Sequence, residues 1–83
     1  MSHLPQDLHD IFPHDEALLR RLKAEDRHFR ALADRYAALD QEIGQIGLGL
    51  EAASDARTEE LKKARLHVLD ELATVLAEAR GAA

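Results

Sequence analysis

The sequence contains no cysteine and no tryptophan, and its 83 residues include two prolines and four glycines. Without cysteine, neither a disulfide nor a thiolate-bound metal can hold the fold together. A chain of this length forms one domain at most and buries a modest share of its surface. Self-association is a common way for so small a domain to gain buried surface.

Positive charge is also scarce, with 11 Lys and Arg against 16 Asp and Glu and a formal net charge of −5. This balance gives no general attraction to DNA, RNA or anionic lipid. The aromatic residues are few: Phe12, Phe29 and Tyr36. Abundant Ala, Leu and charged residues are typical of helices, and 46% hydrophobic residues are too many for a fully disordered chain. We therefore expect an all-α fold.

No run of apolar residues approaches the ~18 needed to span a membrane. The N-terminus lacks the basic start and apolar core of a signal peptide, and Asp7 and Asp10 interrupt it. We expect a cytoplasmic protein.

The residues that carry catalysis or ligand binding show no familiar pattern. Gly44, Gly47 and Gly49 close a predicted helix instead of opening one, unlike a phosphate-binding loop. The histidines nearest the N-terminus are spaced unlike the ligands of a compact metal site, and the hydroxyl residues form no nucleophile motif. We expect no enzyme activity, no cofactor and no bound metal.

A seven-residue repeat predicts a first long helix over about residues 13–46. Two stripes on this helix have the spacing of a coiled coil: Leu22, Phe29, Tyr36 and Ile43, and Leu18, Glu25, Leu32, Leu39 and Ile46. Only Glu25, a charged residue, breaks the apolar pattern of these stripes. Glycines near residues 44–47 are expected to cap the helix.

The remaining segments follow from the same reasoning. Residues 47–57 form a connection, and residues 58–80 form a second helix. Residues 1–12 are a short amphipathic segment, because Leu4, Leu8, Ile11 and Phe12 fall on one helical face. Residues 81–83 are expected to form a loose tail.

Because the connection is short, the two helices are expected to pack antiparallel as a coiled-coil hairpin, with facing residue numbers summing to roughly 104. This register places Asp40 and Glu42 near Lys62, Lys63 and Arg65, and it places Glu25 near Arg80. The ring of Tyr36 is expected to be buried. The predicted hairpin seam consists of Leu22, Phe29, Leu32, Tyr36, Leu39, Ile43, Leu61, Val68, Leu72 and Val75.

The first helix is longer than the second, so its first turns are expected to overhang. Together with an apolar stripe beside the seam, the overhang forms a candidate interface: Leu18, Leu19, Leu66, Leu69 and Leu76. Either residues 1–12 or a second copy could cover the overhang, and we expect a dimer.

A basic cluster begins the second helix: Arg57, Lys62, Lys63 and Arg65. It is either a nucleic-acid contact or a set of ion pairs with the acidic end of the first helix. Nearby Glu59, Glu60, Asp70 and Glu71 favour the ion pairs, because they cancel most of the local field.

The stretch HDEALLRRLKAEDRHFRALADRYAALDQEI at residues 14–43, followed by LKKARLHVLDEL at residues 61–72, resembles the YdcH-like family of small bacterial proteins. Leu69 departs from the family pattern, which usually has lysine there. The resemblance implies a helical hairpin and no known activity. The expected function is therefore that of a non-enzymatic structural or adaptor protein acting through helix–helix contact, with itself and an unidentified protein as partners. The alternative is a nucleic-acid-associated regulator that uses the basic cluster.

Overall fold

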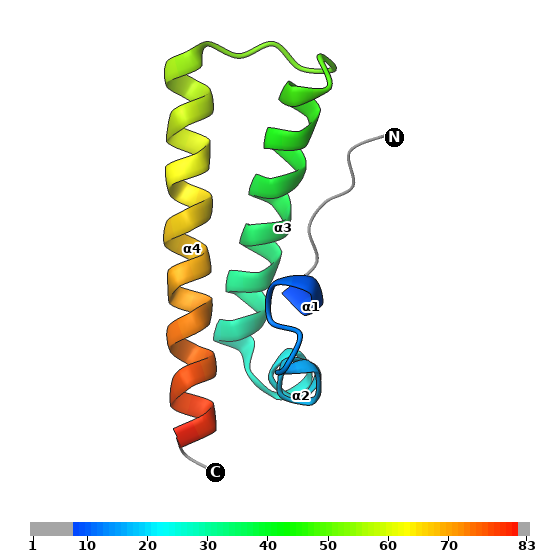
Figure 1. The fold of residues 1–83 in the computed structure, drawn as a ribbon, viewed down its shortest axis with the longest axis vertical. Coiled ribbons are helices and arrows are strands. Elements are labelled where there is room, and N and C mark those ends of the chain that lie inside the picture. Colours follow the sequence, from blue (N-terminus) through cyan, green and yellow to red (C-terminus); the bar gives the residue numbers. More distant parts are fainter. Residues whose placement is uncertain (1–7, 82–83) are drawn as a thin grey trace.

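The computed structural model describes residues 8–81 and contains four helices in that range (Figure 1). They are α1 (Leu8–Ile11), α2 (Glu16–Glu25), α3 (Arg27–Gly47) and α4 (Asp55–Gly81). No strand is present between residues 8 and 81, so the expected all-α fold is confirmed. The predictions for Leu4 and for residues 82–83 lie outside the described residues.

The predicted first helix is not continuous, because Asp26 divides it into α2 and α3. The backbone of Asp26 is extended, with φ −112° and ψ 109°, and its side chain accepts a hydrogen bond of 3.0 Å from the backbone N–H of Phe29. Aspartate is among the preferred residues at a helix N-cap, since its carboxylate satisfies a free N–H of the first turn. The prediction of one helix over residues 13–46 is therefore wrong at this residue.

α3 ends at Gly47, within the expected range, but its cap is a Schellman motif centred on a later glycine. The N–H of Leu50 donates to the carbonyl of Gln45, and the N–H of Gly49 donates to the carbonyl of Ile46. Gly49 has φ +77°, in the left-handed region that favours glycine. Gly44 and Gly47 both lie within the helix, so the cap occurs at Gly49 and not at residues 44–47.

α4 begins three residues before the expected position. The Ser54 hydroxyl accepts a 3.1 Å hydrogen bond from the N–H of Arg57, and the Ser54 carbonyl accepts one of 3.0 Å from the Thr58 hydroxyl. The first of these bonds satisfies a free N–H of the first turn, so Ser54 is the N-cap of α4.

The two long helices, α3 and α4, run side by side in opposite directions along the long axis of the molecule (Figure 1). α2 is seen almost end-on in the same view, so it runs across this axis beside the start of α3. α2 contacts both α3 and α4, and α1 packs on α2. With two additional helices present, the described fold is more than the predicted two-helix hairpin.

All four helices contribute to one hydrophobic core. Its buried members are Leu8 from α1, Leu19 from α2, Phe29, Leu32 and Tyr36 from α3, and Val68, Leu72 and Leu76 from α4. Burial of leucine and phenylalanine side chains contributes about 1.5–3 kcal/mol each, so this cluster is the main source of stability. The bend at Asp26 matters here because it turns Leu19 toward the core.

The expected overhang of the first helix is therefore absent from the described part of the chain. Leu19 is completely buried, and Leu18 and Leu22 pack against the core. The end of α4 is tied to the start of α2 instead, by an ion pair of 2.6 Å between Arg80 Nη1 and Asp15 Oδ2. Arg80 was predicted to face Glu25, which is exposed; the bend at Asp26 brings Asp15 there in its place.

The glycine cap gives a first prediction, with a matched control two residues away. Gly49→Ala should lower the free energy of unfolding by about 1 kcal/mol, because a Cβ is unfavourable in the left-handed region. Gly47→Ala should raise it by about 0.5 kcal/mol, because alanine is the better helix former and no neighbouring atom obstructs its Cβ. Urea unfolding monitored by circular dichroism measures both. Equal effects at the two positions would contradict the assigned cap.

Candidate interaction surface

A buried ion pair lies between α3 and α4, in the part of α3 where the predicted seam residues are not the buried ones. Asp40 is 2% exposed, and its Oδ1 lies 2.6 Å from Nη1 of Arg65. Of the contacts expected between Asp40 or Glu42 and the bases at residues 62, 63 and 65, the one between Asp40 and Arg65 is confirmed. Asp40 and Gly44 take the buried positions of α3 at which Leu39 and Ile43 were expected, and those two are half-buried. The predicted seam is otherwise buried at Phe29, Leu32, Tyr36, Leu61, Val68 and Leu72, while Leu22 and Val75 are half-buried.

Tyr36 lies one turn before Asp40, and its ring is buried, as predicted. Burial raises the pKa of its hydroxyl above the usual value, the Asp40 carboxylate raises the pKa further, and the Arg65 guanidinium lowers it. The neutral hydroxyl is therefore the form that the fold favours.

This shift leads to a second prediction, which concerns alkaline pH. Unfolded tyrosine ionises at about pH 10, and the folded pKa is higher, so the folded state holds this proton more tightly. Stability from this residue is complete below about pH 10 and falls as the pH rises above it. Tyr36 is the sole tyrosine and the sequence has no tryptophan, so phenolate absorbance reports on this residue alone.

Asp40→Asn should lower the titration midpoint toward the usual value without reaching it, because burial remains the larger cause of the shift. Circular dichroism checks that the variant is folded. A midpoint of about 10 in the folded wild-type protein would contradict the buried position of the ring.

Directly after Arg65, the middle of α4 carries an exposed apolar residue. Leu66 is 59% exposed. It lines a shallow groove of about 340 Å³ together with Leu69, Lys62 and Arg65 of α4, Tyr36 of α3 and Ile11 of α1. We call Leu66, Leu69 and this groove the α4 surface.

Of the predicted interface residues, those on the α4 surface are the ones that a partner can still reach. Leu19 and Leu76 are completely buried within the chain, so neither is available to a partner. Leu18 and Leu69 are half-buried against the core, and Leu66 remains exposed. The reason is again the bend at Asp26, which brings α2 against the end of α4.

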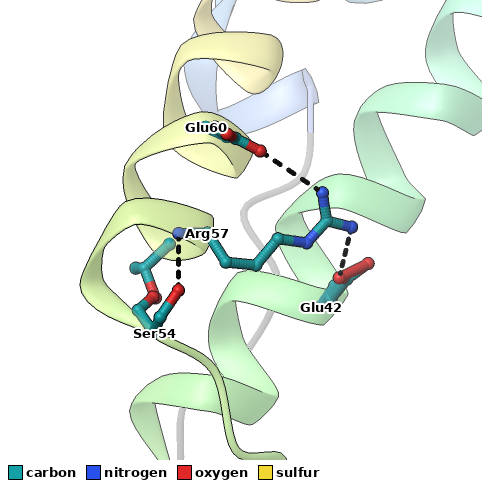
Figure 2. A network of polar contacts seen from close by, with 5 residues as sticks. Glu42, Ser54, Arg57 and Glu60 are labelled. Carbon is teal, nitrogen blue, oxygen red and sulfur yellow. Dashed lines mark hydrogen bonds and ion pairs between the residues drawn. The ribbon is translucent and has the colours of Figure 1, made fainter.

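The basic cluster divides into paired and unpaired residues. Figure 2 shows Arg57 reaching from α4 toward Glu42 of α3, with Nη2 and Oε2 3.6 Å apart, and toward Glu60, with Nη1 and Oε2 3.9 Å apart. Arg65 binds Asp40. Lys62 and Lys63 are exposed and form no ion pair with any residue in the range 8–81.

Among residues 8–81, no three His, Asp or Glu side chains gather as a metal site, and His3 lies outside this range. No helix in the described chain has the length and apolar character to cross a bilayer.

Residues 29–76 match a protein family described as a protein of unknown function (DUF465). The chain belongs to this family. YdcH is a member of DUF465, so the resemblance seen in the sequence is confirmed. Searches of curated proteins and of solved structures gave no significant match.

The DUF465 match covers α3 and most of α4, and with them Asp40, Arg65 and Leu66. Its first and last residues, Phe29 and Leu76, are both completely buried. The match begins after the bend at Asp26, so α1 and α2 lie outside it. The α4 surface is thus a feature of the DUF465 part of the chain, whereas Ile11, at the edge of the groove, is not.

Proposed function

We propose that this DUF465 protein is a non-enzymatic structural or adaptor protein that acts through helix–helix contact, and that its first partner is a second copy of itself. The observation that carries the proposal is the exposure of Leu66 in the middle of a long helix, beside a groove. Burying such a side chain against another helix removes apolar surface from water, which is the main driving force of association.

The neighbourhood of Leu66 supports a helix as the ligand. The groove is lined by Leu69, Tyr36 and Ile11, which are apolar or aromatic, and also by the cationic residues Lys62 and Arg65. An amphipathic helix binds by laying its apolar face into a groove with apolar lining residues. As part of the same proposal, we place the protein in the cytoplasm.

The alternative, a nucleic-acid-associated regulator, has weaker support. Arg57 and Arg65 already face the carboxylates of Glu42 and Asp40, so their charge is largely neutralised. Binding to phosphates needs several free cations on one face, and the chain carries a net charge of −5.

The test is the molar mass in solution at tens of micromolar, measured by light scattering after size exclusion. The proposal expects a wild-type dimer and a monomeric but folded Leu66→Lys variant. Leu50→Lys is the matched control, because Leu50 is a 75% exposed leucine that lies in the connection and not on the α4 surface. A wild-type monomer, or a dimer that survives Leu66→Lys, would overturn self-association through the α4 surface.

A further inference from the structure

A row of exposed side chains on α4 carries charges of opposite sign on either side of Leu66. Lys62, Leu66 and Asp70 are four residues apart, so they lie in line on one face of the helix. All three are exposed. A base thus precedes the apolar residue by one turn and an acid follows it by one turn, each at ~6 Å along the axis.

These two charges have no partner of opposite sign within the described chain. Ion pairs among residues 8–81 involve Arg20, Arg57, Arg65, His67 and Arg80, and none involves Lys62 or Asp70. The charges on either side of Leu66 are thus open to an outside partner.

The order of these residues is self-complementary under a two-fold rotation. In an antiparallel pair of α4 helices centred on Leu66, each Lys62 lies opposite Asp70 of the second copy, and the two Leu66 side chains meet at the axis. A parallel pair would place Lys62 against Lys62 and Asp70 against Asp70. An axis shifted by one turn toward either end would likewise bring like charges together. Charge therefore selects one direction and one register.

We propose that the second copy packs antiparallel on α4, with its axis at Leu66 and with two Lys62–Asp70 ion pairs between the copies. The two-fold arrangement uses the same patch on both chains and closes the assembly at a dimer. The groove lined by Leu69, Tyr36 and Ile11 gives the Leu66 side chain of the second copy a place to pack. This inference rests on the proposed function and adds the geometry of the contact.

Charge reversal tests this geometry directly. Lys62→Glu places two acids opposite each other, and Asp70→Lys places two bases opposite each other, so each variant alone should dimerise at least about tenfold more weakly than wild type. An equimolar mixture of the two variants restores both ion pairs. We expect a heterodimer there, identified by native mass spectrometry, since the two chains differ in mass.

Asp34→Lys is the matched control, because it makes the same charge change at an exposed position of α3. It should leave the dimer intact, and circular dichroism checks the fold of every variant. Variants that dimerise like wild type, or a mixture that forms no heterodimer, would overturn the antiparallel register; if Leu66→Lys still gives a monomer, helix contact through the α4 surface stands. A wild-type monomer would overturn both proposals.

Discussion

Leu72→Asp is expected to unfold the protein or to lower its free energy of unfolding by about 4 kcal/mol or more. Leu72 is completely buried in the core shared by all four helices. The substitution removes a large apolar side chain and introduces a charge with no partner, and both effects are costly. A domain of this size has a total stability of only ~4–12 kcal/mol, so the loss consumes much of it.

Leu50→Asp is the control for this variant, because it makes the same change at a leucine that is 75% exposed. Its free energy of unfolding should stay within about 0.5 kcal/mol of wild type. Helical circular dichroism and thermal unfolding, recorded at low concentration, measure both. An unchanged melting temperature for Leu72→Asp would mean that α3 and α4 do not pack as described.

Arg65→Met is expected to lower the free energy of unfolding by about 3 kcal/mol, because it leaves the buried Asp40 carboxylate without its guanidinium partner. This expected loss of stability is at the low end of the range for breaking buried ion pairs, since the Arg65 side chain is 31% exposed and water can approach it. Methionine keeps most of the apolar stem of arginine, so the change reports mainly on charge.

The double variant Asp40→Leu/Arg65→Met distinguishes the cost of leaving one charge unpaired from the net contribution of the ion pair to stability. Replacing both charges with apolar groups should recover most of the loss, because no buried charge remains unpaired. Arg20→Met is the control: it breaks the exposed Arg20–Glu16 pair and should have almost no effect. Equal losses in the single and double variants would show that the ion pair has no specific role.

The sequence predicts the helices and much of the core, because the helical period marks the buried face regardless of what covers it. Phe29, Leu32, Tyr36, Val68 and Leu72 were all expected to be buried, and they are. The predicted register is also close: Asp40 and Arg65 are in contact, and their numbers sum to 105. Short connections and antiparallel packing leave few alternatives for such a pair.

The bend at Asp26 could not be predicted from periodicity, because the apolar residues on both sides of it serve the same core. Leu18 and Leu22 keep the heptad spacing whether or not the helix continues. The available signals were Glu25, a charge at an expected seam position, and Asp26, a good N-cap residue. A local cap competes here with one more helical turn, and contacts between Leu19 and the core decide the outcome.

The sequence contains a signal for the burial of Asp40. Arg65 lies on the apolar face of α4, where a guanidinium requires a carboxylate opposite. The candidate interface was predicted less well, because Leu19 and Leu76 appear available only if the first helix is straight. Their burial depends on the path of the chain at Asp26, which is a tertiary property.

The Arg80–Asp15 ion pair joins residues 65 positions apart in the sequence, whereas the Asp40–Arg65 pair spans 25. Closing a longer loop costs more chain entropy, so contacts of the second kind form more readily. By this argument we expect the α3–α4 contact to form before the contact between the end of α4 and the start of α2. In the reverse direction we expect the contact between α2 and the end of α4 to open first, so that amide protons of α1 and α2 exchange with solvent before those of the long helices.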